Sequence, residues 1–171
     1  SSSINIGLIH PAEIIKEISA VKSKIPSNSF EGYLRQLFWR EYQRYTYIHI
    51  DWKHQDFFKH KGTLSKKWYN GTTGIPPIDD LIQYGFYTGY IHHIGRLMYI
   101  GNFMVLNQIS NSLIKKWFTE FAIDSYDWVM TQNVLDMVCF ATGGVTMRKP
   151  YITSSNYIIN NSEYKKGEWS D

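Results

Sequence analysis

Apolar residues recur at helical spacing along most of the chain, and this periodicity constrains the fold more than any other feature. Between Pro11 and Ile25, isoleucines and a valine repeat every three or four residues until Pro26 ends the run. The same spacing, with capping residues and helix breakers at the ends, predicts further helices at about 29–48, 80–88, 92–106, 110–123 and 132–141. Strands are hard to place anywhere, so the sequence predicts an all-α fold.

The segments between these helices are polar and rich in turn residues. Residues 52–78 carry a basic run from Lys59 to Lys67 and then several Gly and Pro residues, and Asp79 is predicted to cap the helix that follows. From Pro150 onward the chain is polar again. A length of 171 residues without an internal repeat or a linker suggests one domain.

Cysteine content, hydropathy and charge exclude several classes of protein. The single cysteine, Cys139, rules out an internal disulfide and a cluster held by four thiolates, and it fits a reducing compartment. No run of 18 apolar residues is present, and no metal-ligand spacing such as His-Glu-x-x-His occurs. The net charge of +3 is too small to indicate a nucleic-acid partner by itself. We therefore expect an intracellular protein with no membrane span and no metal site.

The adjacent pair His92-His93 is the sharpest local feature. Neighbouring side chains on a helix diverge by about 100°, so the two imidazoles cannot easily bind one metal ion. One of them is more suited to face a pocket, where it would donate or accept a proton, while the other packs. Taken without further context, two ordinary core or surface histidines are the more common explanation.

Charged and aromatic residues give two further hints. Arg96 and Asp124 lie in otherwise apolar helical surroundings, where they could flank a flat polar ligand or form a structural ion pair. The segment from Trp39-Arg40 to Tyr45 interleaves rings with guanidinium groups, as sites that stack flat bases and bind phosphates do. Aromatic residues make up 16% of the chain, so an aromatic-rich core is the alternative.

Several motifs occur in order at spacings that resemble one known family. The pattern W-x-x-G-x-T-G-x-P-x-x-D runs from Trp68 to Asp79, His92-His93 and Arg96 follow it, and Trp39-Arg40-Glu41-Tyr42 precedes it. This combination resembles the photolyase/cryptochrome family in its flavin-binding helical domain. Further motifs resemble the bacterial branch that includes (6-4) photolyases with an iron–sulfur cluster: His92 to Met98, Gly101-Asn102-Phe103, Trp117, Asp124, Trp128-Val129, Asn133, Lys149-Pro150-Tyr151, Tyr157 and Ser162-x-Tyr164.

The resemblance implies an all-α, C-terminal FAD-binding domain without the family's N-terminal α/β antenna domain. It implies FAD as the cofactor, UV-damaged DNA as the partner and light-driven repair of a flipped-out pyrimidine lesion as the activity. Residues that match the family's FAD-binding positions are Ser1, Arg96, Asn102 and Asp124. His93 matches the histidine that protonates the lesion in (6-4) photolyases, with His92 in support, and the positions that contact the lesion or DNA are Gln36, Trp39, Arg40, Tyr151 and Tyr157.

The chain departs from the family pattern at two places. Met130 stands at the position expected to face flavin N5, where a thioether cannot donate a proton. Lys165 and Glu168 stand where the branch has two cluster cysteines, and Cys139 cannot replace them. We therefore expect no iron–sulfur cluster and an altered redox cycle.

These observations lead to one expected organisation and three expected functions. Residues 1–171 are predicted to form a FAD-binding helical domain that is incomplete at its N-terminus. Either the chain is a fragment of a longer protein, or a separate polypeptide carries the antenna half. The favoured function is (6-4) photoproduct repair by the catalytic half of a split or truncated photolyase. The alternatives are a cryptochrome-like blue-light flavoprotein without repair, which Met130 favours, and a degenerate remnant that does not hold FAD.

Overall fold

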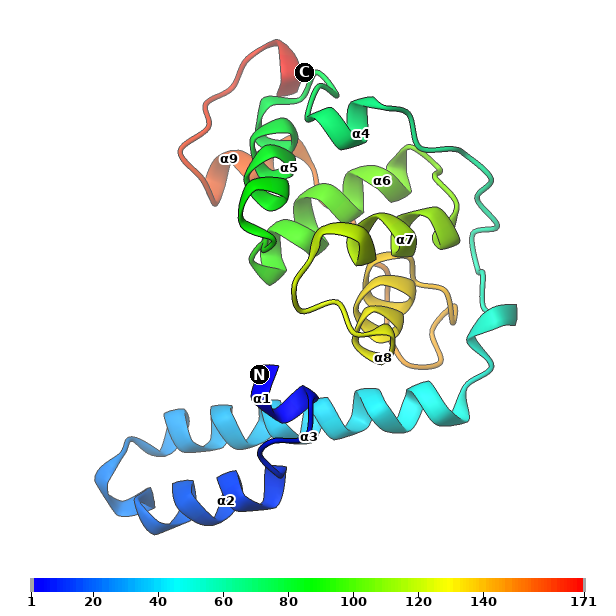
Figure 1. The fold of residues 1–171 in the computed structure, drawn as a ribbon. Coiled ribbons are helices and arrows are strands. Elements are labelled where there is room, and N and C mark those ends of the chain that lie inside the picture. The colour runs from blue at the N-terminus through cyan, green and yellow to red at the C-terminus, as the bar shows by residue number, and fades with distance from the viewer. Residues whose placement is uncertain (1, 171) are drawn as a thin grey trace. The chain divides into compact units, whose positions relative to one another are not determined.

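A computed structural model describes residues 2–170, and their backbone consists of helices joined by turns and coil (Figure 1). No β-strand occurs within this range, where Gly62 and Ile109 form an isolated parallel bridge. The all-α fold predicted from the sequence is therefore confirmed. The chain divides into two compact units, one that ends at Ile50 and one that begins at Asp51.

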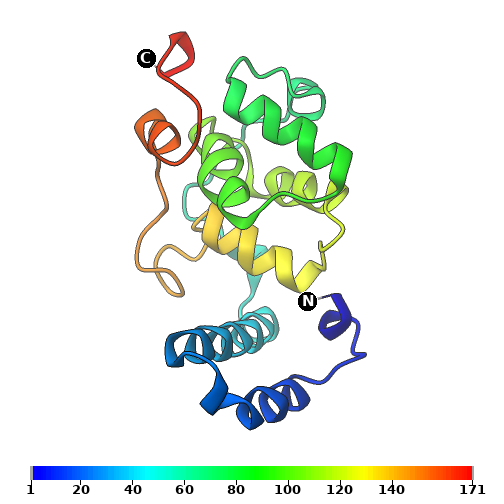
Figure 2. The ribbon, with the colours of Figure 1, turned by 90° about the vertical axis from the view of Figure 1, so that its left-hand side faces the viewer.

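The first unit is a helical hairpin. Its helices are α1 (Ser2–Asn5), α2 (Pro11–Ala20) and α3 (Ser27–His49), with a 3₁₀ turn at Lys22–Lys24. His10 Nδ1 accepts a hydrogen bond from the Ala12 amide at 3.2 Å, and the Glu13 carboxylate accepts one from the His10 amide, so α2 begins with a capping box. Helices α2 and α3 lie side by side in both ribbon views (Figures 1 and 2).

The buried positions of α3 differ from the stripe that the sequence suggests. Helical spacing places Phe30, Leu34, Phe38, Tyr45 and Ile48 on one stripe. Of these, Phe30 is buried as predicted, but the side chains of Phe38, Tyr45 and Ile48 are exposed. Leu37 and Thr46 are buried instead. Helix α2 has 10 residues and α3 has 23, so α2 can cover only part of α3. The apolar spacing alone did not show which part.

The second unit contains the remaining helices, packed around one core. They are η2 (Trp52–His54), α4 (Lys67–Asn70), α5 (Pro76–Thr88), η3 (Gly95–Gly101) with α6 (Asn102–Leu106), α7 (Asn111–Phe121), α8 (Asp127–Met130) with η4 (Thr131–Val138), α9 (Ser155–Asn160) and η5 (Glu168–Ser170). Element η3 packs against α5 and η4, and η4 packs against α7. The core is apolar and fully buried at its centre, with Ile78, Ile82, Ile100, Ile114, Trp117 and Phe118 each at most 1% exposed.

Asp79 performs a different task from the one predicted. Helix α5 begins at Pro76, so Asp79 lies inside its first turn and does not cap it. Its carboxylate accepts hydrogen bonds from the Thr73 and Gly74 amides, at 2.7 and 3.0 Å, and from the Thr73 hydroxyl. The carboxylate therefore fixes the turn that leads into the helix. The start of the helix itself is set by the two prolines, Pro76 and Pro77.

Two helices of the core contain π-helical segments, η3 and η4. The sequence predicts helices in both places, but the spacing of apolar residues does not reveal a wider turn. π-Helical turns are rare and are frequently found at functional sites. In this chain the two π-helical segments pack against each other.

Gly101 makes this close packing possible, and we expect Gly101→Ala to lower the free energy of unfolding by about 1–3 kcal/mol. A Cβ atom at this position would lie 2.6 Å from the Arg96 carbonyl oxygen and 2.7 Å from Val138 Cγ1. Urea unfolding measures the loss. Gly32→Ala is the matched control, because a Cβ at Gly32 inside α3 meets no atom of another element within 4 Å and should stabilise the helix. Equal effects at the two glycines would contradict the prediction.

Candidate functional site

A cavity of about 110 Å³ opens between the start of the η3 helix, the loop after α7 and the α8–η4 helix. Seven apolar side chains supply most of its wall: Ile91, Leu97, Phe118, Val129, Met130, Val134 and Val138. Its polar residues are Tyr90, His93, Arg96, Asp124 and Asn133. The cavity thus brings together four residues that the sequence proposed for one site, His93, Arg96, Asp124 and Met130.

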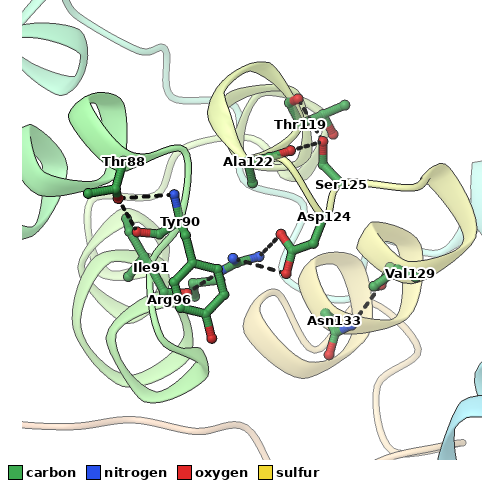
Figure 3. A network of polar contacts seen from close by, with 10 residues as sticks. All are labelled: Thr88, Tyr90, Ile91, Arg96, Thr119, Ala122, Asp124, Ser125, Val129 and Asn133. Atoms are coloured by element: carbon green, nitrogen blue, oxygen red, sulfur yellow. Dashed lines mark hydrogen bonds and ion pairs between the residues drawn. The ribbon is translucent and has the colours of Figure 1, made fainter. Parts of the chain in front are cut away.

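Arg96 and Asp124 form an ion pair at the cavity (Figure 3). Arg96 Nη1 lies 2.9 Å from Asp124 Oδ1, and Arg96 Nη2 donates to Asp124 Oδ2 at 3.2 Å. Arg96 Nε donates to the Ile91 carbonyl oxygen at 2.5 Å, and the guanidinium carbon lies 5.1 Å from the centre of the Tyr90 ring. These contacts fix the orientation of the guanidinium group, and the Arg96 side chain is 12% exposed.

The backbone of two loops holds the two members of this pair together. The Ile123 amide donates to the Gly89 carbonyl oxygen at 2.9 Å, which joins the loop before Arg96 to the loop that carries Asp124. Gly89 has a φ of 69°, and a Cβ there would lie 2.7 Å from Ile123 Cγ2. The Ser125 hydroxyl donates to the carbonyl oxygens of Thr119 and Ala122, as Figure 3 shows, and this closes the second loop.

The two adjacent histidines have different environments. His93 lines the cavity, although the residue as a whole is exposed. His92 lies just before the helix, where its Nδ1 accepts a hydrogen bond from the Ile94 amide at 3.3 Å and its carbonyl oxygen accepts one from the Arg96 amide at 3.1 Å. His92 thus caps the helix that carries His93 and Arg96.

The environment of His93 lowers its pKa below the ordinary value of 6.5. Partial desolvation of the ring is the main cause, and the positive charges of Arg96 and His92 add to it. His93 therefore binds a proton more readily in the unfolded chain than in the folded protein. As a result, it lowers the free energy of unfolding at pH values below its ordinary pKa and has no such effect above that pKa.

We therefore expect His93→Gln to raise the free energy of unfolding at about pH 5 and to leave it nearly unchanged at about pH 8. Urea unfolding at both pH values measures the difference. His49→Gln, which removes an exposed histidine from the first unit, serves as the control for losing an imidazole. A gain of the same size at both pH values would show that His93 acts on stability by some route other than its charge.

The other predicted residues of the second unit lie beside the core and not in the wall of the cavity. Asn102 is buried, and its amide group bonds to the backbone of Thr153. Tyr151 and Tyr157 are partly buried against the core, and the Tyr157 ring lies 6.4 Å from the Tyr99 ring, edge to face. Their roles in FAD or lesion binding remain predictions.

The predicted residues of the first unit lie on α3. Gln36 is exposed, and the Trp39 ring stacks on Tyr42 at a centroid distance of 5.3 Å. Arg40 donates to Asn5 Oδ1 at 3.3 Å and to the Ile4 carbonyl oxygen at 3.1 Å, which ties α3 to α1. Ser1 lies outside the described residues.

Two contributors to the cavity were missed by the sequence argument, Tyr90 and the Ile91 carbonyl group. Both follow Gly89, whose left-handed backbone ends α5 and turns the chain toward the next helix. A glycine at the end of one helix, three residues before a histidine pair, is the signal that could have identified them. Asn133 lines the cavity too, but its side-chain amide donates to the Val129 carbonyl oxygen one turn earlier.

Comparisons with known proteins identify the same domain. Residues 33–166 match the family described as the FAD binding domain of DNA photolyase. A (6-4) photolyase of Agrobacterium fabrum is 36% identical over 166 residues, which is 94% of this chain and 33% of that protein. Two uncharacterized proteins of Acanthamoeba polyphaga mimivirus also match, one 54% identical over 43% of this chain and 60% of its own length, the other 38% identical over 52% and 72%.

The chain spans about a third of the photolyase relative. In its described part, every helix is too short or too polar to cross a lipid bilayer. The family match covers well over half of the chain and includes every residue of the cavity. The chain therefore belongs to the DNA photolyase family, through that family's FAD-binding domain.

Proposed function

We propose that the protein binds FAD at the cavity and acts as the catalytic half of a light-driven photolyase, with the (6-4) photoproduct as the favoured lesion. Membership of the family supports FAD, and a relative that is a (6-4) photolyase supports the lesion. The observation that carries the proposal is the oriented Arg96–Asp124 pair at a mostly apolar cavity.

The residues of the cavity fit an isoalloxazine ring. Asp124 Oδ1 is buried and, among the described residues, accepts no hydrogen bond of good geometry, although Arg96 Nη1 lies 2.9 Å away. The pyrimidine edge of the ring offers an N–H donor and carbonyl acceptors, which suit a carboxylate and a guanidinium group. Its flat apolar faces suit the walls that Phe118, Val134 and Val138 provide.

Each proposed role follows from the chemistry of one side chain. When bound, FAD supplies light absorption and the transferred electron. Arg96 and Asp124 bind and orient the polar edge of the ring. His93 is assigned the transfer of a proton to the lesion, and its lowered pKa would make the imidazolium, once formed, a stronger acid. Met130 is 2% exposed and lines the cavity, where its sulfur gives no proton.

We assign the lesion and DNA contacts to five residues on the basis of the family motifs: Gln36, Trp39, Arg40, Tyr151 and Tyr157. Stacking on aromatic rings and pairing with a cation are the usual means of holding a flipped base and its phosphates. The loss of the iron–sulfur cluster is part of the same proposal, and iron and sulfide analysis of the purified protein tests it.

A cryptochrome-like flavoprotein without repair activity is the second candidate, and Met130 favours it. A buried thioether cannot donate a proton, which would change the reduced states that a flavin bound at the cavity can adopt. In that case the bound flavin would respond to blue light, but the lesion would remain in DNA.

Titration of the full chain with FAD, followed by illumination with a damaged oligonucleotide, separates the candidates. One oligonucleotide carries a single (6-4) photoproduct, one carries a cyclobutane dimer and one is undamaged. Light-dependent restoration of the first supports the proposal, and full FAD occupancy without restoration supports the cryptochrome-like candidate. A protein that takes up no FAD would contradict both.

The variant His93→Asn tests the proton donor directly. We expect it to retain FAD, because Arg96 and Asp124 are untouched, and to lose repair of the (6-4) photoproduct. Repair at the wild-type rate by His93→Asn would refute the role of His93.

A further inference from the structure

The coil before α9 is fastened to the cavity helix through Thr153. The Thr153 hydroxyl donates a hydrogen bond to the Met98 carbonyl oxygen at 2.7 Å. Asn102 Nδ2 donates to the Thr153 carbonyl oxygen, and Asn102 Oδ1 accepts from the Thr153 amide, both at 3.2 Å. Three hydrogen bonds therefore join one residue of the coil to residues 98 and 102 of the helix, and we call this contact the Thr153 latch.

The latch engages the helix where its backbone is π-helical. In an α-helix the amide of residue 102 would donate to the carbonyl oxygen of residue 98. Here the Asn102 amide points to the carbonyl oxygens of Leu97 and Tyr99, and the carbonyl of Met98 receives the hydroxyl of Thr153. The Thr153 hydroxyl thus donates to the Met98 carbonyl oxygen, which would accept from the Asn102 amide in an α-helix. This hydrogen bond favours the wider turn over an α-helical one.

The wider turn decides where Arg96 points relative to the rest of the helix. Changing a π-helical turn to an α-helical one rotates the residues on its two sides by about one residue, or about 100°. Arg96 lies at the beginning of η3 and lines the cavity, whereas Asn102 follows its end and bonds to Thr153. Both contacts are compatible with the π-helical form that the structure shows.

We propose that Thr153 and Asn102 are positioning residues for the cavity: the Thr153 latch holds η3 in its π-helical form and so holds Arg96 against Asp124. This inference rests on the proposed function in one respect, that the cavity binds FAD. It assigns a role to Asn102 that differs from direct contact with the cofactor. Neither residue lines the cavity.

Flavin spectroscopy tests whether the Thr153 latch orients Arg96 or only joins the coil to the helix. Thr153→Val removes the hydroxyl donor and keeps the branched shape, and Thr153→Ser keeps the hydroxyl. We expect about three- to tenfold weaker FAD binding and a changed visible circular dichroism band for Thr153→Val, because one partly buried hydrogen bond is lost. Thr153→Ser should restore both. Thr72→Val, in the exposed turn before α5, is the matched control and should leave both unchanged.

Amide hydrogen exchange without FAD tests the latch independently of the proposed function. Thr153→Val and Asn102→Leu should speed exchange at residues 95–102 and leave α7 protected. Asn107→Leu is the control for the second variant, because Asn107 is exposed and its side chain bonds to Phe103 of its own helix.

Each result has one meaning for the proposal. Unchanged exchange at residues 95–102 in Thr153→Val would overturn it. Faster exchange at residues 95–102 with an unchanged flavin band and unchanged FAD affinity would overturn the positioning role. The Thr153 latch would then stabilise the helix without affecting the cavity. If the wild-type protein takes up no FAD, the proposed function fails, and with it the positioning role, while the exchange rates still decide whether the latch holds the helix.

Discussion

Replacing Trp117 by alanine should lower the free energy of unfolding by about 3–5 kcal/mol, one of the largest effects a single substitution can have in this chain. Trp117 is fully buried, and its ring lies 4.9 Å from Phe118 and 4.8 Å from Phe121, between centroids. Its Nε1 donates to the Trp68 carbonyl oxygen at 2.8 Å, across 49 residues of sequence. Alanine would leave a cavity and an unpaired carbonyl group.

Urea unfolding of Trp117→Ala and Trp117→Phe separates the two losses. Phenylalanine keeps most of the apolar volume and removes the Nε1 donor, so it should cost about 1–3 kcal/mol. Trp169→Phe is a control for losing an indole, since Trp169 lies near the end of the chain and is only partly buried. A loss for Trp117→Ala no larger than that of Trp169→Phe would show that Trp117 is not central to the core.

The second large effect is expected at the cavity, where Arg96→Leu should weaken FAD binding by about tenfold to a hundredfold. Hydrogen bonds to charged groups contribute about 1.5–3 kcal/mol, and 1.4 kcal/mol corresponds to a tenfold change. The variant removes the donors that fix Asp124 and leaves its buried Oδ1 without a cation. Protein stability should fall less, because the Asp124 side chain is 37% exposed and water screens its charge.

A double-mutant cycle with Asp124→Leu gives this prediction a sharper form. We expect Arg96→Leu/Asp124→Leu to regain the stability that Arg96→Leu loses, since no charge is left unpaired, and to regain none of the FAD affinity. Lys115→Leu is the matched control, because Lys115 Nζ forms an ion pair with Asp127 at 2.7 Å outside the cavity. FAD affinity that is equal in Arg96→Leu and Lys115→Leu would refute the role assigned to the pair.

The sequence predicted the helices more completely than the packing between them. Helix α2 begins at Pro11 and α5 ends at Thr88, as predicted, because proline and glycine act through the local backbone. The predicted end of the first helix at Ile25 and the predicted start of α5 at residue 80 were wrong, since α2 ends at Ala20 and α5 begins at Pro76. The exposed position of Tyr45 on α3 was not predictable, because burial depends on which helix lies opposite. Helix α9 has only 6 residues, too few for a periodic pattern to stand out.

The candidate site was predictable as far as its charged residues. The charged pair and the histidine were apparent because charges are rare among apolar helical positions, and the divergence expected for His92-His93 agrees with their different environments. The Ile91 carbonyl contact and the Thr153 latch were not apparent, because both use backbone groups that every residue has. The π-helical turns were hidden for the same reason.

The cap at His92 has a consequence for the proton on that ring. Its Nδ1 can accept the Ile94 amide hydrogen only when that nitrogen carries none, so neutral His92 must keep its own hydrogen on Nε2. The start of the helix therefore selects one tautomer of the imidazole next to His93. The helix start thus selects the tautomer of one of two neighbouring rings, the ring that does not line the cavity.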